Sequence, residues 1–425
     1  MALLDRVSIH GFRGARDVEL APRRLCALVG EASGGKSTVL TAIWMLLESG
    51  APVPNASDVT YAANSGRIRL EASTDVQTFF LDARPPATLN LNREGAPPVV
   101  FLPTSRRGRD LVSVATHPKA SRPVELIRSA DDLSDAVERL VAARVRGLVV
   151  LIEEPELYLS PQAQRHLYRL LRALADRGNQ VLYSTHASTF LSVAHLDELA
   201  LVRQGPAAGM ALLQPQPLPS DESFRALAEF DAERAEMFLS RAVLLVEGLT
   251  EKLALPFVFE ALGYEPDHEG ILILETGGKA NMPLFARICN ECGIPYVVLH
   301  DRDAPRGKAP NESERVTNRA IAEVTGRGRV VQLIPDFEGV IGLTPRSRRS
   351  RKPERAYRRF SGGRPVPEEL VEAVERVVAA ARGERRRASG GAAPARAQRE
   401  AGGGTSATPR GVQPPRPRAR PPRGR

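Results

Sequence analysis

Residues 30–38, GEASGGKST, lie between an apolar run and a segment of helical periodicity. The run Leu25–Val29 has the character of a buried strand, and apolar residues recur at the spacing of one helix face from Leu40 to Leu47. The stretch matches the pattern G-x-x-x-x-G-K-[ST]. Backbone amides of such a loop, and the start of the helix after it, attract anionic phosphate. A glycine-rich turn without a ligand is the alternative, but the strand before and the helix after favour nucleotide binding.

The pattern assigns roles within this loop. Lys36 is expected to reach the outer phosphates of a nucleotide, and Ser37 is expected to ligate Mg²⁺. The residues of the loop predicted to bind ATP and its Mg²⁺ are Gly30, Gly34, Gly35, Lys36, Ser37 and Thr38.

An acidic residue at the end of a second buried strand should complete the nucleotide site. The stretch LVVLIEEPELYLSPQ, residues 148–162, supplies Glu153 and Glu154. We expect Glu153 to hold Mg²⁺ through water and Glu154 to orient or deprotonate the attacking water. His186, directly after the next strand, is placed to sense the γ-phosphate. The alternatives are two solvated glutamates at a strand end and an ordinary loop histidine.

Three motifs together, GEASGGKST, LVVLIEEPELYLSP and LYSTH, resemble the ABC-type ATPase heads of the RecF and SMC-like class over roughly residues 1–205. In that class the nucleotide is sandwiched between two heads, so the resemblance implies ATP hydrolysis and a homodimer. Two positions depart from the class. Ala32 replaces a usual asparagine, and the segment nearest to a signature motif, residues 131–140, contains no glycine.

After a Pro-rich stretch at 214–223, apolar strands and helices alternate. Four apolar strands with three intervening helices predict a small parallel sheet covered on both faces. The predicted fold class is therefore α/β, with a P-loop ATPase domain followed by a Rossmann-like parallel sheet.

Carboxylates follow several strands of this second sheet. The stretch LLVEGLTEKLAL, residues 244–255, places one glutamate at a strand end and another one helical turn later. Because ligand sites of parallel sheets gather at the carboxyl ends of their strands, these acids should converge and require compensating cations. Oxygen ligands of this kind select Mg²⁺ or Mn²⁺. The predicted metal ligands of this sheet are Glu247, Glu251, Asp301, Asp303 and Glu338, with Asp336 as a rival for the last.

The opening E-G-x-T-E at 247–251 and the later D-x-D resemble the Toprim domain of the OLD (overcoming lysogenization defect) family of ATP-dependent nucleases over residues 241–340. The resemblance implies an ATP-regulated, Mg²⁺- or Mn²⁺-dependent DNA endonuclease that uses a two-metal mechanism in DNA repair or phage defence. It assigns catalysis to Glu247 and Asp301, with Lys279 offsetting charge at the scissile phosphate. DNA and a helicase-type protein are the implied partners.

Two other functions fit the same features. One is an ATP-gated DNA-binding clamp of the RecF/SMC type without nuclease activity. The other is a different Toprim chemistry, such as strand passage or primer synthesis, although no obvious nucleophilic tyrosine is present for the former.

The sequence predicts five consecutive parts: an ABC-type P-loop ATPase domain at 1–213, a linker at 214–240, a Toprim domain at 241–345, a basic loop with a C-terminal helix at 346–382, and a disordered Arg/Pro/Gly-rich tail at 383–425.

Composition places most of the positive charge at the end of the chain. The formal net charge is +9, yet residues 381–425 alone hold 12 Arg, no Lys and two Glu. Such a segment adds salt-sensitive affinity for phosphates, or is simply a solvated extension. The absence of a long apolar run predicts no membrane span, and only three Cys predict a reducing, cytoplasmic compartment. The pair Cys289 and Cys292 favours core packing over zinc binding.

Overall fold

The computed structural model describes residues 3–60, 66–86, 88–104, 117–205, 209–220, 222, 231–326, 328–343, 352–361 and 365–388. Residues Met1–Gly391 form one compact unit, which contains every described helix and strand. Most of the predicted tail, from residue 389 onward, lies outside the described residues.

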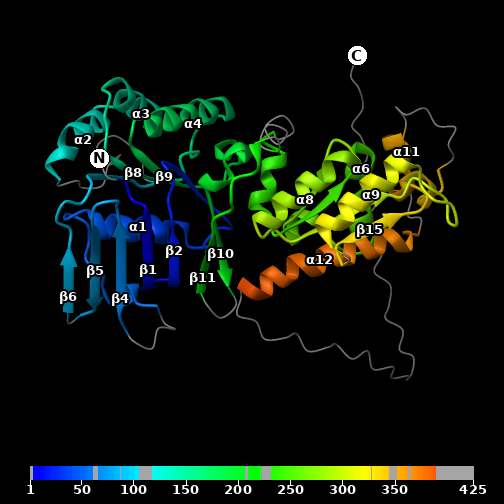
Figure 1. The fold of residues 1–425 in the computed structure, drawn as a ribbon, viewed down its shortest axis with the longest axis horizontal. Helices are drawn as coiled ribbons and strands as arrows, with labels where there is room; N and C mark the ends of the chain where they lie inside the picture. The colour runs from blue at the N-terminus through cyan, green and yellow to red at the C-terminus, as the bar shows by residue number, and fades with distance from the viewer. Residues whose placement is uncertain are drawn as a thin grey trace, which may run out of the picture. The chain divides into compact units, whose positions relative to one another are not determined.

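An eleven-stranded sheet organises the first part of the unit (Figure 1). In spatial order its strands are β6 (Thr88–Asn92), β5 (Thr78–Arg84), β4 (Ile68–Ser73), β1 (Arg6–Phe12), β2 (Ala15–Leu20), β11 (Gly209–Leu213), β10 (Leu199–Gly205), β3 (Leu25–Val29), β9 (Gln180–Thr185), β8 (Val149–Glu153) and β7 (Val99–Leu102). Neighbours from β10 to β7 are parallel, and the other pairs are antiparallel.

The parallel strands are buried on both faces, which explains their continuous apolar sequences. Alternate residues of β3 and β8 enter two different cores. Leu28 and Leu151 pack in the core that contains α1 (Lys36–Leu47). Ala27 and Val150 pack in the core that contains α2 (Ser121–Arg128), α3 (Leu133–Ala142) and α4 (Pro161–Asp176). The helix α1 therefore covers one face of the parallel strands, and the other three helices cover the opposite face.

A second, four-stranded sheet has the predicted all-parallel arrangement. Its spatial order is β13 (Ile271–Glu275), β12 (Ala242–Val246), β14 (Tyr296–Asp301) and β15 (Val330–Leu333). The helices of this part are α6 (Leu249–Ala261), α7 (Pro266–Glu269), α8 (Met282–Glu291), α9 (Glu312–Thr325), α10 (Phe337–Val340), α11 (Lys352–Ser361) and α12 (Glu368–Ala388). Short 3₁₀ turns occur at η1 (Ala56–Asp58), η3 (Pro118–Ala120), η4 (Ser188–Phe190), η5 (Val193–Glu198), η6 (Arg234–Leu239) and η7 (Lys279–Asn281).

The strand β12 shows how this sheet is covered on both faces. Val243 and Leu245 pack in a core that contains α8, whereas Leu244 and Val246 pack with α6, α11 and α12. The predicted α/β fold class is confirmed: the first sheet is mixed, and the second is the expected small parallel sheet. The terminal helix α12 continues to Ala388, past its predicted end at residue 382.

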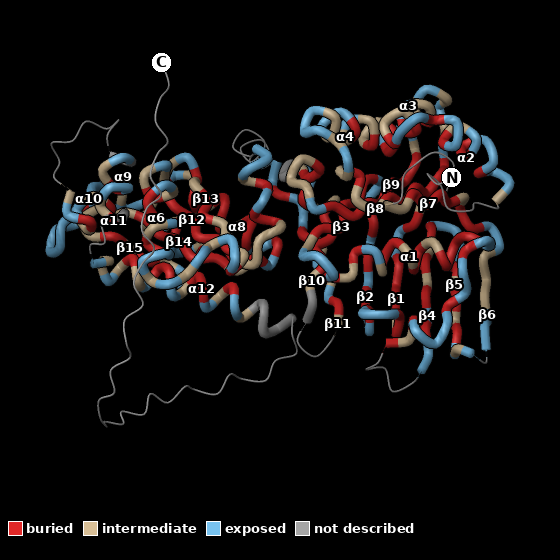
Figure 2. The backbone as a smooth tube through the Cα atoms, turned by 180° about the vertical axis from the view of Figure 1, so that it is seen from behind, coloured by how far each residue is buried: buried red, intermediate tan, exposed pale blue. Residues whose placement is uncertain are grey.

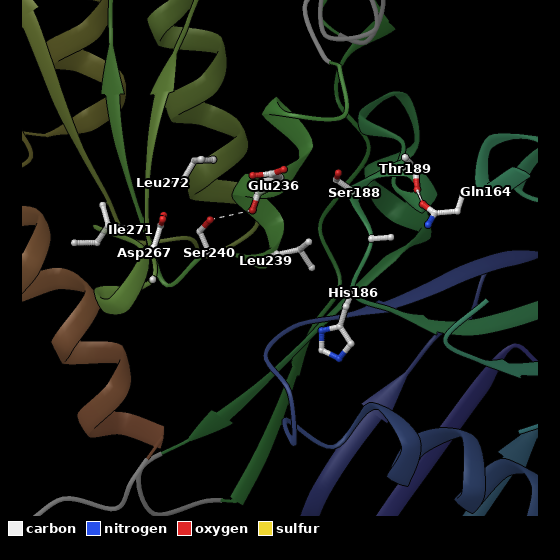
Figure 3. Close-up of a pocket in the computed structure, with 12 residues that line it drawn as sticks. Gln164, His186, Ser188, Thr189, Glu236, Leu239, Ser240, Asp267, Ile271 and Leu272 are labelled. Carbon is white, nitrogen blue, oxygen red and sulfur yellow. Dashed lines mark hydrogen bonds between the residues drawn. The ribbon is translucent and has the colours of Figure 1, made fainter. Parts of the chain in front are cut away.

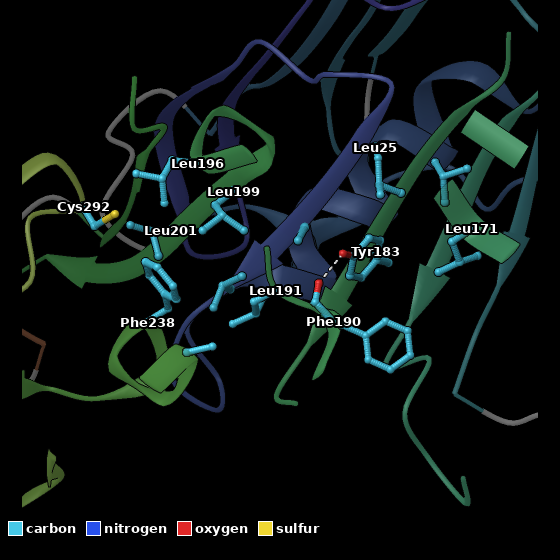
Figure 4. Close-up of a cluster of buried hydrophobic side chains, with 14 of the residues drawn as sticks. Leu25, Leu171, Tyr183, Phe190, Leu191, Leu196, Leu199, Leu201, Phe238 and Cys292 are labelled. Atoms are coloured by element: carbon cyan, nitrogen blue, oxygen red, sulfur yellow. Dashed lines mark hydrogen bonds between the residues drawn. The ribbon is translucent and has the colours of Figure 1, made fainter. Parts of the chain in front are cut away.

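Buried residues line most of the labelled strands, whereas β6 has none (Figure 2). In one apolar cluster the Tyr183 hydroxyl donates a hydrogen bond of 2.6 Å to the carbonyl oxygen of Phe190 (Figure 4). Cys292 is fully buried in the same cluster, and Cys289 is buried beside it, so both cysteines pack in the core as the sequence favours. No helix within the described residues is long and apolar enough to cross a membrane.

Candidate nucleotide and metal sites

The phosphate loop joins β3 to α1 as predicted. Gly30 has a φ of +149°, and a Cβ atom there would lie 2.0 Å from the carbonyl oxygen of Val202 in β10, so only glycine fits. Gly35, with a φ of +108°, is the N-cap of α1 and supplies no side-chain cap. The first-turn amides of α1 are therefore left for an anionic ligand.

Lys36 is folded back onto its own loop. Its Nζ donates hydrogen bonds to the carbonyl oxygens of Gly30 at 2.9 Å and Glu31 at 2.8 Å. Burial lowers the pKa of Lys36 to about 8, although the charges of Glu154, Glu156 and Glu31 oppose the shift. Ser37 is exposed and Thr38 half-buried in the first turn of α1, beside this lysine.

The predicted acidic pair lies at the carboxyl end of β8. Glu153 is its last residue and pairs in register with Ser184 of β9. Glu154 has a φ of 44°, and its N–H donates to the carbonyl oxygen of Ser184 at 3.0 Å, which holds this left-handed conformation in place. The Nε2 atom of His186 lies 3.9 Å from Oε1 of Glu154. The structure thus brings Glu154 and His186 together near Lys36.

Glu156 organises this edge, a function that the motif alone did not reveal. Its two carboxylate oxygens accept hydrogen bonds from the Thr185 hydroxyl at 3.0 Å and from the backbone N–H of His186 at 2.6 Å. Burial first, and then the charge of Lys36, lower the pKa of His186, so the imidazole is neutral at pH 7. His186 also lies on a cavity of about 420 Å³ whose other wall includes η6 and the start of β13 (Figure 3).

The phosphate loop is tied to the residue that precedes β12. Arg241 Nε donates to Glu31 Oε1 at 2.8 Å, and both residues line a smaller cavity of about 190 Å³ beside the loop.

In the second sheet, Glu247 directly follows β12, and it contacts Asp301, the last residue of the adjacent strand β14. Oε1 of Glu247 accepts the N–H of Asp301 at 2.7 Å, and Oδ1 of Asp301 accepts the N–H of Phe337 at 2.8 Å. Glu251 is buried in the first turn of α6, and Glu338 lies near enough to raise its pKa. The rival Asp336 instead caps α10 by accepting the Gly339 N–H at 2.6 Å.

Burial and mutual repulsion make these acids hard to ionise. Burial, followed by the charges of Glu247, Glu251 and Asp303, raises the pKa of Asp301 to about 9. Burial raises the pKa of Glu247 to about 7, with Asp303 and Glu314 adding to it. Burial, followed by Glu247 and Glu338, raises the pKa of Glu251 to about 7.

Lys279 is the cation that this edge already contains. It is buried in η7, and its Nζ contacts Oδ2 of Asp303 and lies 2.9 Å from Oε2 of Glu314. Burial alone would lower the pKa of Lys279, but hydrogen bonds to these two carboxylates raise it overall. Asp303 has a φ of 59°, and its carboxylate faces Lys279.

The donor set fits a hard divalent cation, because the predicted ligands offer carboxylate oxygens and burial raises the pKa values of Glu247, Glu251 and Asp301. The oxygens are nevertheless engaged with backbone N–H groups and with Lys279. In the part of the chain that the structure describes, no group of three or more His, Cys, Asp or Glu side chains is arranged to hold an ion as it stands. An ion would compete with Lys279 for the carboxylate of Asp303.

Comparison with known proteins agrees with this geometry. A family model described as "Overcoming lysogenization defect protein-like, TOPRIM domain" matches residues 238–303, which include four of the five predicted metal ligands. The second sheet belongs to an OLD-like Toprim domain. A model described as "AAA domain, putative AbiEii toxin, Type IV TA system" matches residues 121–192, and one for a protein of unknown function matches residues 1–55. The Toprim domain is thus preceded by an AAA-type ATPase domain.

Two nucleases are among the relatives of the Toprim-containing chain. The OLD nuclease of Thermus scotoductus is 34% identical over 215 residues, or 46% of this chain and 40% of the relative. The Old nuclease of Escherichia phage P2 is 31% identical over 161 residues, or 36% of this chain and 28% of the relative. The chain therefore spans less than half the length of these relatives.

Solved structures that match are less similar. The C-terminal region of the Burkholderia pseudomallei OLD protein matches with 17% identity and a TM-score of 0.27, covering 33% of this chain and 98% of that one. The SMC head domain from Thermotoga maritima matches with 12% identity and a TM-score of 0.34, covering 50% of this chain and 99% of that one.

Proposed function

We propose that this chain is an ATP-regulated, divalent-metal-dependent DNA endonuclease of the OLD type. The observation that carries the proposal is the hydrogen bond from the backbone N–H of Asp301 to the carboxylate of Glu247, which brings two half-buried acidic residues to one edge of a parallel sheet. Relatedness to OLD nucleases supports the reaction class.

In this proposal, Glu247, Glu251, Asp301, Asp303 and Glu338 hold Mg²⁺ or Mn²⁺. A pair of such ions would stabilise the attacking and leaving oxygens of a phosphodiester displacement. The ammonium group of Lys279, which Asp303 and Glu314 hold, would donate a hydrogen bond to a non-bridging oxygen of the scissile phosphate.

The ATPase domain supplies regulation. With ATP bound, Lys36 would turn from its loop carbonyls to the nucleotide phosphates, Ser37 and Glu153 would hold the Mg²⁺ ion, and Glu154 and His186 would act on the attacking water and the γ-phosphate. We extend the proposal to a homodimer through the ATPase domains, to a cytoplasmic role in DNA repair or phage defence, and to a helicase-type partner. The ATPase domain at 1–213 and the Toprim domain at 241–345 would divide these tasks.

The test is nicking of supercoiled plasmid with Mn²⁺, with and without ATP. We expect the wild-type chain to nick the plasmid and Glu247→Gln to lose this activity. Glu260→Gln, which removes an exposed carboxylate from the same domain, serves as the control and should retain it. Wild-type protein that leaves the plasmid intact would contradict the nuclease assignment.

The second candidate, an ATP-gated DNA-binding clamp without nuclease activity, has one observation in its favour. Lys279 already neutralises Asp303, so this edge is partly compensated without an added ion. The clamp predicts DNA binding that depends on ATP, no nicking, and no effect of Glu247→Gln on either property.

A further inference from the structure

Glu314 lies outside the predicted metal ligands, yet it contacts the site. It is in the first turn of α9, where its own N–H is held by the side chain of Asn311 at 2.9 Å. Its carboxylate turns inward, with Oε2 lying 2.9 Å from Nζ of Lys279. The helix start is therefore fixed by a cap, and the side chain is free to serve a second element.

Lys279 contacts two carboxylates that come from different elements of the fold. Asp303 directly follows the strand β14 beside Asp301, whereas Glu314 comes from a helix beyond the loop after it. Only about a third of each carboxylate side chain is exposed, and that of Lys279 is 9% exposed. An ammonium group with so little access to water needs a carboxylate partner at all times, because an unpaired buried charge is costly.

A divalent ion at this edge would compete with Lys279 for Asp303. If Asp303 were the only partner of the lysine, binding an ion would leave the ammonium buried and unpaired. With Glu314 present, the ammonium retains a carboxylate partner while Asp303 turns to the ion. The same contact keeps the ammonium at the rim where the scissile phosphate would arrive.

We propose that Glu314 is a positioning residue of the Toprim site, which shares Lys279 with Asp303 and retains its ammonium group at the rim when Asp303 turns to a divalent cation. This inference rests on the proposed nuclease function. It assigns Glu314 an effect exerted through Lys279 and not as a ligand of the ion.

The experiment compares Glu314→Gln with Glu312→Gln in the full chain, using Mn²⁺ alone as the ligand. Glu312 is in the same turn of α9 but is exposed and pairs with Arg315 at the surface. Mn²⁺ binding is measured by calorimetry, and nicking is measured at saturating Mn²⁺. We expect Glu314→Gln to bind Mn²⁺ about fivefold more weakly and to nick about tenfold more slowly, while Glu312→Gln matches the wild type.

A double-mutant cycle with Lys279→Met separates positioning from ligation. Because Glu314 acts through the lysine, Glu314→Gln should change Mn²⁺ affinity by less than about twofold once Lys279 is absent. An undiminished loss of Mn²⁺ affinity in that background would make Glu314 a direct ligand and overturn the inference. Equal behaviour of Glu314→Gln and Glu312→Gln in the wild-type background would also overturn it.

Failure of the nuclease assignment would look different. In that case the wild type neither binds Mn²⁺ at this edge nor nicks plasmid, whatever residue stands at position 314. Melting temperatures in EDTA, measured for every variant, identify any variant whose losses arise from misfolding.

Discussion

Two buried lysines, one in each domain, are held by different kinds of group. Lys36 donates to the carbonyl oxygens of its own loop, whereas Lys279 contacts two carboxylates. Burial lowers the pKa of Lys36 to about 8, but hydrogen bonds to Asp303 and Glu314 outweigh burial and raise the pKa of Lys279.

The difference indicates which kind of ligand, anion or cation, each site is arranged to bind. Carbonyl dipoles bind an ammonium group weakly compared with a charged phosphate, so Lys36 can move to an anionic ligand at little cost. Lys279 already has anionic partners and must be displaced from one of them before a cation can enter. The phosphate-loop site is therefore arranged for an anion, and the Toprim site balances its acids with an internal cation.

Among these variants, Asp301→Asn should cause the largest loss of nicking activity. Removing the central carboxylate should reduce nicking at least about 100-fold, more than the loss of an outer-shell residue usually costs. Because the substitution removes a half-buried carboxyl group whose pKa is raised, the melting temperature in EDTA should not fall. Plasmid nicking and thermal unfolding of the same preparations provide the two measurements. A variant that loses both activity and stability would show that Asp301 is structural.

Lys36→Met should separate the two sites. ATP hydrolysis should fall about 100-fold because the lysine is the principal cation for the phosphates. Nicking with Mn²⁺ in the absence of ATP should change less than about threefold, since the carboxylate edge is left intact. Lys119→Met, at an exposed lysine of the same domain, is the control. Loss of ATP-independent nicking in Lys36→Met alone would mean that the sites are not separable.

A smaller effect is expected for Glu156→Gln. The carboxylate accepts two hydrogen bonds from Thr185 and His186, and the amide can accept only through its one oxygen. ATP hydrolysis should fall about tenfold while ATP binding changes little. His166→Ala, an exposed histidine of α4, should leave both properties unchanged. Equal losses in ATP binding and hydrolysis would indicate that Glu156 supports the loop generally.

The smallest effect concerns pH. The pKa of Asp301 is raised to about 9, and the pKa values of Glu247 and Glu251 are raised to about 7. The folded, metal-free protein therefore binds more of these protons than the unfolded chain, and its stability must fall as pH rises towards 9. We expect its melting temperature to drop by about 3 °C between pH 6 and pH 9, and the drop to shrink in Glu251→Gln. An unchanged slope in that variant would place the titrating groups elsewhere.

Much of the fold was predictable because its main signals are local. Glu247 and Asp301 each follow an apolar run, and parallel strands with this spacing bring their carboxyl ends to one edge. The phosphate loop was likewise predictable from the pattern that contains Gly30 and Lys36. The short strand β6 and the helix α2 were not predicted, because the former has no buried face and the latter is brief.

The supporting residues could not be predicted for a different reason. Glu314 lies in a helix turn where an acid is ordinary, and only the packing of α9 against the sheet directs it to Lys279. Glu156 was visible in the sequence, but its bonds to the end of β9 depend on a strand pairing that no local pattern specifies. Contacts between distant segments decide both roles.

Calorimetric titration of the nucleotide-free chain with Mn²⁺ at pH 7 tests whether the carboxylates at the ends of β12 and β14 together hold a divalent cation. We expect saturable binding accompanied by proton release, because Asp301 must lose its proton to bind an ion. Both the binding and the proton release should disappear in Asp301→Asn and persist in Lys36→Met. Absence of Mn²⁺ uptake by the wild type, or uptake that survives Asp301→Asn unchanged, would contradict the claim.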